Sequence, residues 1–193
     1  MPSVTTTLAL IQQYLSVTLG ILLILGVVGN TLNCFIFLRK RLHSNPCSAF
    51  FAASSLANIL VLIWYIIPAI YSAYNPPPDN SNVIYCKLRP YIRSALLVIS
   101  RSYFTLACVA CYAESSRNAR IRNLCRSTIV LRAIGIVPVV WFIIPIHILV
   151  ITDIQNGKCL MWTGAAALYN SIYVCIVATI LPTSLMIVFS SRL

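Results

Sequence analysis

Five long apolar runs, separated by short polar connections, dominate the pattern of this sequence. The apolar residues are continuous and do not alternate with polar ones, as they would in the strands of a membrane barrel. A helix needs about 20 such residues to cross a bilayer, and these runs are roughly 23 to 25 residues long. The pattern predicts five membrane-spanning helices: Tyr14 to Leu38, Phe50 to Tyr74, about 86–114 around the apolar run Arg89 to Tyr112, Ile129 to Ile151, and Ala165 to Phe189.

The composition fits a chain that is dissolved in lipid. Hydrophobic residues make up 60% of the sequence and charged residues 9%, which is too few to solvate a globular surface. Helices satisfy their own backbone groups in lipid, so the predicted fold is an all-α polytopic transmembrane bundle. We expect residues 1–193 to form one transmembrane domain without a cleavable signal peptide, because no basic residue precedes the first run.

The basic residues predict the orientation, because Lys and Arg concentrate in short cytoplasmic loops. The second and fourth connections are nearly balanced, with Asp79 against Lys87 and Arg89, and Asp153 against Lys158. We therefore expect a plasma-membrane protein with an extracellular N-terminus and Arg192 inside. The first and third connections would be cytoplasmic, because basic residues outnumber acids there. The acid is Glu114, and the basic residues and histidine are Arg39, Lys40, Arg41, His43, Arg117, Arg120, Arg122 and Arg126.

The net charge of +11 would suggest a nucleic-acid partner in a soluble protein, but no nucleic-acid-binding motif accompanies it. Most of these cations are better interpreted as topology signals beside an anionic leaflet. The 3 acids and 2 histidines do not share a membrane layer, which disfavours catalysis. We expect no enzyme activity, no cofactor and no bound metal, with His147 making a polar contact.

The 8 cysteines divide between the two sides of the predicted bundle. Cys86 and Cys159 fall near helix ends on the outer side, where oxidising conditions allow a disulfide; two free thiols are the alternative. Cys47 and Cys125 face the reducing side. The remaining cysteines lie in the apolar runs, where packing as small apolar side chains is expected; they are Cys34, Cys108, Cys111 and Cys175.

Several short features occur in an order and spacing that resemble those of the rhodopsin-like (class A) G-protein-coupled receptors. They are Gly29-Asn30, Ser55-Leu56-Ala57-Asn58, Cys86, Leu106 to Tyr112, Trp141, Cys159 and Pro182. The resemblance implies an extracellular ligand, a heterotrimeric G protein as partner, and the first five helices of a seven-helix architecture. It places Tyr112, Arg117, Arg120 and Arg122 where such receptors meet their G protein.

The chain departs from the family pattern at two functional positions. Ala110 and Cys111 stand where the family carries an Asp-Arg pair, and a thiol lacks the five donors and permanent charge of a guanidinium. Asn58 stands where the family carries a sodium-binding Asp, with Ser100 as the other half of that site. We expect weak or absent sodium binding, which a sodium-dependent shift in ligand affinity would contradict.

The sixth and seventh helices of that architecture are absent from the sequence, and the sixth is the helix that moves when such receptors signal. Two hypotheses stay open: a receptor or receptor fragment that signals by helix rearrangement, and a non-signalling truncated protein that associates with a full-length relative. A small transporter or channel would predict paired intramembrane charges or inverted repeats, and the sequence has neither.

Three arginines, Arg89, Arg93 and Arg101, lie on one broad face of the third helix. Leu97 falls between the last two, so that the four residues follow one another at a spacing of four. Arg101 follows Cys86 by 15 residues, about 22 Å along the axis and near mid-bilayer. A charge there costs roughly 3 kcal/mol on insertion scales and needs a partner. Because no acid lies at that depth, we expect a polar side chain such as Asn58 or Ser100, a ligand anion, or a group on the absent helices.

In the family, the outer half of the third helix lines the ligand pocket, so the resemblance makes Arg93, Leu97 and Arg101 candidates for ligand contacts. An acidic, peptide-like ligand is compatible with them; for Arg93, snorkelling to the interface is the alternative. Deeper in the bundle, Asn30 is expected to pack by an interhelical hydrogen bond to Asn58.

Overall fold

A computed structural model describes residues 4–39, 45–122 and 125–191 of the chain. Five helical segments are long and apolar enough to cross a membrane: Leu10–Phe37, Pro46–Tyr74, Val83–Ser115, Ser127–Ile151 and Ala165–Ser190. The predicted all-α polytopic bundle is therefore confirmed, and the chain is described below as a multi-pass membrane protein. Lys40, Arg41, His43 and Arg192, which helped to predict the orientation, lie outside the described residues.

The first three spans are single helices, α1 (Val4–Phe37), α2 (Pro46–Tyr74) and α3 (Val83–Ser115), and the last two are interrupted. The fourth span joins α5 (Ser127–Ile143) to α6 (His147–Ile151) through a 3₁₀ turn at Ile144–Ile146, and the fifth joins α7 (Ala165–Tyr173) to α8 (Leu181–Ser190) through a π-helical segment at Val174–Ile180. Short elements fill the connections: a 3₁₀ turn at Pro78–Asn80, α4 (Ala119–Arg122), β1 (Thr152–Gln155) and β2 (Lys158–Met161).

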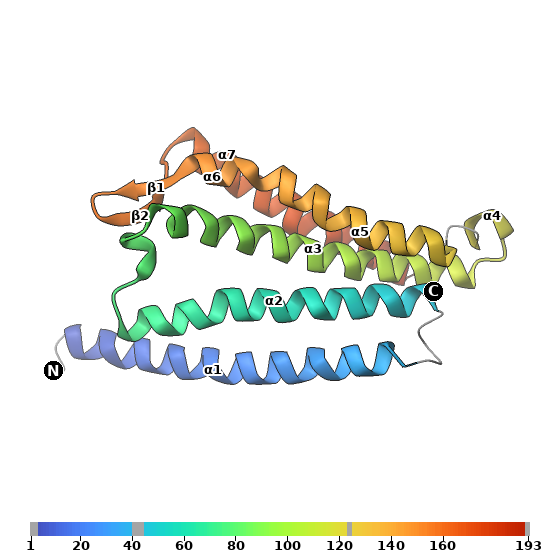
Figure 1. The fold of residues 1–193 in the computed structure, drawn as a ribbon, viewed down its shortest axis with the longest axis horizontal. Coiled ribbons are helices and arrows are strands. Elements are labelled where there is room, and N and C mark those ends of the chain that lie inside the picture. The colour runs from blue at the N-terminus through green and yellow to red at the C-terminus, as the bar shows by residue number, and fades with distance from the viewer. Residues whose placement is uncertain (1–3, 40–44, 123–124, 192–193) are drawn as a thin grey trace.

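The connecting elements gather at two opposite ends of the bundle (Figure 1). The antiparallel hairpin β1–β2 and the Pro78–Asn80 turn lie at one end, with the start of α1, and α4 lies at the other. We call these the outer end and the inner end, following the predicted orientation. The Pro-rich turn and the hairpin are thus neighbours in space, although about 70 residues separate them in the sequence.

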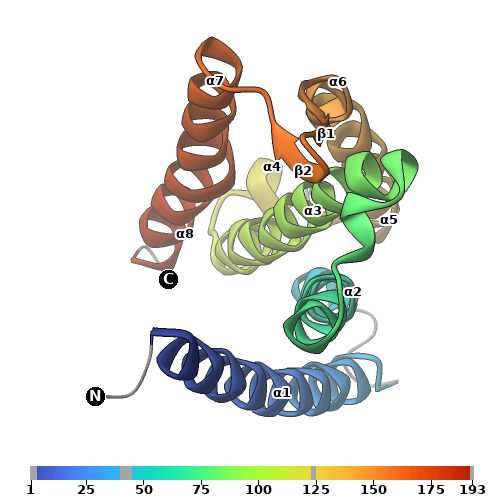
Figure 2. The same cartoon turned by 90° about the vertical axis from the view of Figure 1, so that its left-hand side faces the viewer.

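The central element is α3, which is enclosed by α2 on one side and by α5 and α8 on others (Figure 2). In the apolar part of α3, 44% of the residues are buried, against 6% in α1, whose large apolar side chains face outward to lipid. Small side chains are buried along α2 and α3, and two of them meet across the contact between these helices, where Ser54 Oγ donates to the Ser100 carbonyl; the small buried residues include Ala52, Ser54, Ala57, Ala95, Ser100 and Ala107. Small residues let two helices approach closely, which is how helices associate in lipid.

Two asparagines start the helices that carry the candidate sites. The Asn45 side chain accepts hydrogen bonds from the backbone N–H groups of Cys47 and Ser48, and Asn82 does the same for Ile84 and Tyr85. These bonds satisfy amide groups that have no partner within their helix.

The hairpin was not predicted from the sequence. Thr152 pairs with Met161 and Gln155 with Lys158, which leaves Asn156 and Gly157 as the two turn residues. Both have positive φ, 51° and 72°, as a two-residue turn between twisted strands requires. The Asn156-Gly157 pair is the sequence feature that could have predicted a hairpin, but the flanking strands are too short to show an alternating pattern.

Candidate functional site

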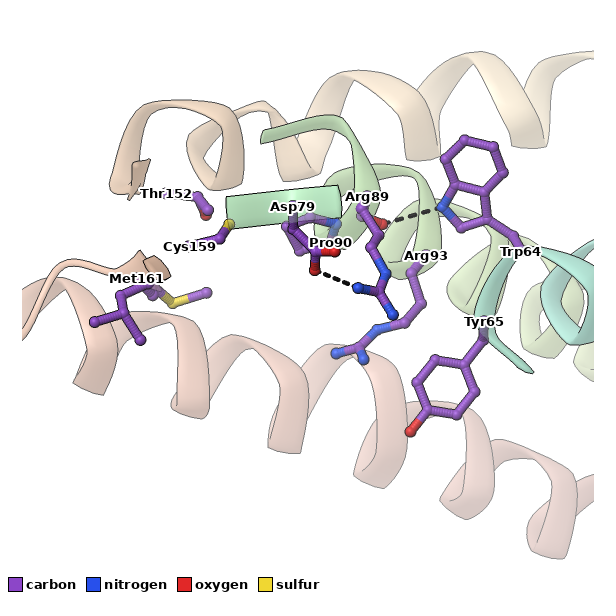
Figure 3. Close-up of a pocket in the computed structure, with 10 residues that line it drawn as sticks. Trp64, Tyr65, Asp79, Arg89, Pro90, Arg93, Thr152, Cys159 and Met161 are labelled. Carbon is purple, nitrogen blue, oxygen red and sulfur yellow. Dashed lines mark hydrogen bonds and ion pairs between the residues drawn. The ribbon is translucent and has the colours of Figure 1, made fainter. Parts of the chain in front are cut away.

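A pocket of about 310 Å³ opens at the outer end between α2, the start of α3 and the β1–β2 hairpin (Figure 3). The Pro78–Asn80 turn and the hairpin form its wall on one side, and aromatic residues of α2 form it on the other. Its lining includes Trp64, Tyr65, Asp79, Arg89, Arg93, Thr152 and Met161.

The cationic floor of this pocket comes from α3. Arg89 forms an ion pair with Asp79, and its backbone carbonyl accepts a hydrogen bond from Trp64 Nε1 at 3.1 Å. One turn further along, the Arg93 guanidinium lies 5.2 Å from the centre of the Tyr65 ring, an attraction worth about 0.5–1 kcal/mol at an exposed site. Two guanidinium groups against one carboxylate give the lining a net charge of +1, and Arg93 is exposed toward the opening.

Two buried oxygens at the pocket have no hydrogen-bond partner among the described residues: Asp79 Oδ1 and Thr152 Oγ1. A buried oxygen without a partner is costly, and a bound polar group would relieve that cost. The Thr152 hydroxyl can donate to a carboxylate, whereas Asp79 Oδ1 can only accept from an N–H or O–H group. Both oxygens are closed to solvent, so the group that the lining offers directly to a ligand is the exposed guanidinium of Arg93.

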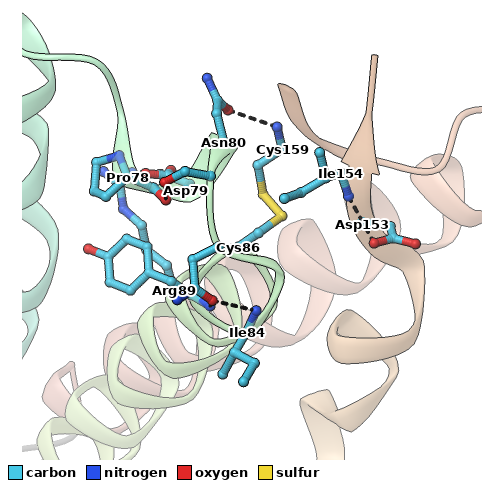
Figure 4. The surroundings of a disulfide bond; sticks show 12 residues. Pro78, Asp79, Asn80, Ile84, Cys86, Arg89, Asp153, Ile154 and Cys159 are labelled. Atoms are coloured by element: carbon cyan, nitrogen blue, oxygen red, sulfur yellow. Dashed lines mark hydrogen bonds and ion pairs between the residues drawn. A yellow bond between two sulfur atoms is a disulfide. The ribbon is translucent and has the colours of Figure 1, made fainter. Parts of the chain in front are cut away.

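A disulfide fixes the hairpin over the pocket (Figure 4). Cys86, which is fully buried, is bonded to Cys159 with a Cα–Cα distance of 5.7 Å. Asn80 Oδ1 accepts a hydrogen bond of 2.9 Å from the Cys159 N–H, which joins the Pro78–Asn80 turn to the same strand. The predicted bridge is present, and the alternative of two free thiols is wrong for this pair.

A second polar cluster joins α1, α2 and α3 within the bundle. Asn58 Nδ2 donates to Asn30 Oδ1 at 3.3 Å, so the structure contains the interhelical hydrogen bond expected for Asn30. Ser100 Oγ donates to Asn58 Oδ1 at 2.5 Å, and Ser54 Oγ donates to the Ser100 carbonyl. The amide oxygen that would coordinate a cation is therefore engaged by a hydroxyl, and the cluster holds no anionic group.

Arg101 contacts a polar side chain, as one expectation held, but this side chain is Thr179 instead of Asn58 or Ser100, and the contact with a backbone carbonyl was not expected. Its Nη1 donates to the backbone carbonyl of Ala178 and to Thr179 Oγ1, both in the π-helical segment of the fifth span. In an α-helix the Ala178 carbonyl would accept from residue 182, which is Pro182 and has no N–H. Arg101 therefore donates to a carbonyl that lacks its usual partner, and the signal for this was the proline four residues later.

The remaining candidates of the third helix do not join the outer pocket. Arg93 lines it, as the resemblance implied, but Leu97 and Arg101 are not among its lining residues.

His147 was expected to make a polar contact. Its ring packs against the rings of Tyr169 and Tyr173, with a distance of 5.1 Å between ring centres in each pair. Its Nδ1 is 3.3 Å from the Ile144 carbonyl oxygen.

At the inner end, the candidates for G-protein contact lie near one another in the chain. The Tyr112 ring packs on Phe189 of α8, with ring centres 5.5 Å apart. Arg117, Arg120 and Arg122 are exposed on and before α4. Their side chains are free to meet a partner beyond the end of α3.

The inner end also corrects the interpretation of two cysteines. Cys111, expected to pack as a small apolar side chain, is bonded to Cys47, which was assigned only to the reducing side. The Cα–Cα distance is 5.4 Å, within the usual range for a disulfide. The pairing was missed because 64 positions separate the two residues, and the sequence does not show which faces of α2 and α3 meet.

No protein-family model matches this sequence, and no curated protein matches it either. Its function therefore has to be argued from the geometry described above.

Proposed function

We propose that this chain is a membrane receptor, or a receptor fragment, of the rhodopsin-like kind, which binds an extracellular ligand in its outer pocket and transduces the signal to a G protein. The observation that carries the proposal is the pocket beneath the Cys86–Cys159 hairpin, with its excess guanidinium, Arg93. Ligand pockets are typically concave sites in which aromatic side chains combine with convergent polar groups, and this pocket combines Trp64 and Tyr65 with two arginines and Asp79. The ligand we propose is peptide-like and carries a carboxylate.

The carboxylate is favoured over a neutral group for an electrostatic reason. Asp79 already neutralises Arg89, whereas no acid among the described residues pairs with Arg93, whose guanidinium lies over the Tyr65 ring. A guanidinium binds a carboxylate through two parallel N–H···O bonds, which are stronger than bonds between neutral groups.

Replacing Arg93 with glutamine is expected to weaken binding of an acidic ligand roughly 10- to 150-fold, because a hydrogen bond to a charged group is worth about 1.5–3 kcal/mol. The probe is a library of short peptides, each made as a free acid and as a C-terminal amide. Binding is read from the thermal stabilisation of the purified chain in detergent or lipid nanodiscs.

Arg132→Gln is the matched control, because Arg132 is an exposed arginine of α5 that does not line the outer pocket. It should leave the preference for acids over amides unchanged. Equal binding of acids and amides by the wild-type chain, or an unchanged preference in Arg93→Gln, would refute the carboxylate site.

The proposed location is the plasma membrane, with the N-terminus outside. The exposed arginines Arg117, Arg120, Arg122 and Arg126 at the inner end support this orientation, as do the nearly balanced charges at the outer end. The chain has three lysines, Lys40, Lys87 and Lys158, which makes a direct test simple.

A membrane-impermeant amine-reactive ester applied to intact cells is expected to label Lys158, which is exposed on β2, and to spare Lys40 until the cells are permeabilised. Mass spectrometry of the two peptides reads the result. Labelling of Lys40 but not Lys158 on intact cells would reverse the proposed orientation.

Coupling to a G protein is supported by the exposed basic surface beside Tyr112. Nucleotide exchange on purified G-protein heterotrimers, with the chain in nanodiscs, tests it; the double variant Arg117→Glu/Arg120→Glu should abolish any exchange that the wild type stimulates. No stimulation by the wild-type chain with a bound ligand would exclude coupling.

The second candidate is a non-signalling receptor-like protein that acts by association with a full-length relative. Ala110 and Cys111 favour it, because the guanidinium of the family is missing and Cys111 is bonded to Cys47. Co-purification of the chain with a tagged rhodopsin-like receptor, together with no nucleotide exchange, would select this candidate over the first.

A further inference from the structure

The disulfide between Cys47 and Cys111 lies at the inner end of the bundle. Cys47 is the second residue of α2, two positions after the capping residue Asn45, and is 7% exposed. Cys111 lies in the last turns of α3. The bond therefore joins the first turn of one spanning helix to the last turns of another.

The two disulfides of the chain are at opposite ends of one helix. Cys86 and Cys111 both belong to α3 and are 25 residues apart, which is about 37 Å along the helix axis. The hydrocarbon core of a bilayer is about 30 Å thick. In a membrane-spanning α3, the two bonds lie near opposite surfaces, whichever way the chain is inserted.

Opposite surfaces of a cell membrane meet different redox conditions. The extracellular side preserves disulfides, whereas glutathione and thioredoxin keep cytosolic thiols reduced. The basic residues around α4 assign the Cys47–Cys111 end to the cytosol. One bond is thus in the compartment that maintains it and the other in the compartment that reduces it.

We propose that Cys47 and Cys111 form a reversible thiol–disulfide pair, a redox modification site that covalently joins the inner ends of α2 and α3 under oxidising conditions. The inference rests on the location of the pair and on the orientation of the chain, and it does not depend on the proposed receptor function.

The oxidant we assign to the reaction is a low-molecular-weight disulfide, glutathione disulfide. One cysteine thiolate attacks a sulfur of this molecule, whose S–S bond breaks; a mixed disulfide forms and one glutathione thiolate leaves. The second cysteine thiolate then attacks the protein sulfur of the mixed disulfide and releases the second glutathione. The protein pair loses two electrons and two protons. Glutathione disulfide gains them and becomes two glutathione thiols.

A neighbouring thiol does not compete strongly for this exchange. The Cys125 Sγ donates to the Ala110 carbonyl at 3.5 Å, which places it beside the same part of α3. Burial raises the pKa of the Cys125 thiol, and the charge of Glu114 raises it further. The raised pKa lowers the fraction of Cys125 that is thiolate at neutral pH, and a thiol is a much weaker nucleophile than a thiolate.

The pair would change how firmly α2 and α3 are held at this end. Around it lie Phe50, Tyr103, Ala107 and Val130, which form the buried cluster of the inner half. In the reduced protein this packing alone joins the two helices. In the oxidised protein the covalent bond prevents them from separating.

The test titrates the full chain in nanodiscs with glutathione buffers of varied reduced-to-oxidised ratio. Free thiols are trapped with a maleimide, and the peptides that contain residues 47, 86, 111 and 159 are quantified by mass spectrometry. We expect residues 47 and 111 to change together from alkylated to disulfide-linked across the ratios found in cells.

Variants give the matched control. Cys47→Ser and Cys111→Ser should each remove the redox-dependent step, and Cys125→Ser should leave it intact. Because the wild-type peptides are read directly, the result does not require every variant to fold.

The proposal fails if residues 47 and 111 stay reduced in fully oxidised glutathione, or if they stay linked in fully reduced glutathione. The first result means that no bond forms, and the second that the bond is permanent.

Discussion

Replacing Cys86 with serine is expected to lower the free energy of unfolding by up to about 4 kcal/mol. The bond between Cys86 and Cys159 closes a loop with a sequence separation of 73 residues, and the chain-entropy model gives this value for a loop of that length. Much of α3 and the whole fourth span lie within that loop, so its loss frees the hairpin and the outer wall of the pocket together. Thermal or denaturant unfolding of the purified chain in detergent measures the effect.

Two further variants show whether the loss belongs to the bond. Cys159→Ser should cost as much as Cys86→Ser, and the double variant should cost no more than either, because both single changes remove the same bond. Cys175→Ser is the control, since Cys175 is an exposed free thiol of the fifth span. Single variants as stable as the wild type would show that the bridge does not stabilise the fold.

Replacing Ala107 with leucine is expected to destabilise the bundle by about 2–3 kcal/mol. Ala107 has no exposed surface and lies on α3 at its contact with α2; its carbonyl is 3.5 Å from Cys47 Sγ. A larger side chain must force the two helices apart, and inserting methylene groups into a packed core typically costs 1–3 kcal/mol. The helices of this chain meet through small residues, so the added volume has no space to enter.

Ala165→Leu is the matched control, because Ala165 is exposed at the start of α7. It adds the same side chain to a spanning helix without crowding another helix. Unfolding of both variants under the same conditions gives the comparison, and equal stability of the two would show that α2 and α3 do not depend on close approach at Ala107.

The spans were predictable because hydropathy is a local property. The third and fifth helices follow the apolar runs closely, and the first begins at Val4 instead of Tyr14 because the uncharged leader continues the helix. Pro145 and Pro182 mark places where a spanning helix can be distorted, but the sequence did not specify a 3₁₀ turn at the first and a π-helical segment before the second, since a proline in a membrane helix can be accommodated in several ways.

Some contacts between residues of different spans were also predictable. The Asn30–Asn58 bond and the Cys86–Cys159 bridge involve residues whose depth or side of the membrane follows from position along a span. The position of Arg93 at the outer pocket was expected from the resemblance to receptors whose third helix lines the ligand pocket with its outer half. For the other two contacts, depth or side of the membrane was sufficient, because few polar groups share each level.

The sequence by itself determined the number of spans, their approximate ends and the side on which the cations gather, because transfer of a helix into lipid depends on its own side chains. Only the tertiary structure decided that Cys47 pairs with Cys111, that Arg101 donates to the Ala178 carbonyl, and that the hairpin encloses a pocket with Arg93. These contacts depend on the rotation and tilt of each helix about its neighbours, and packing between helices sets both.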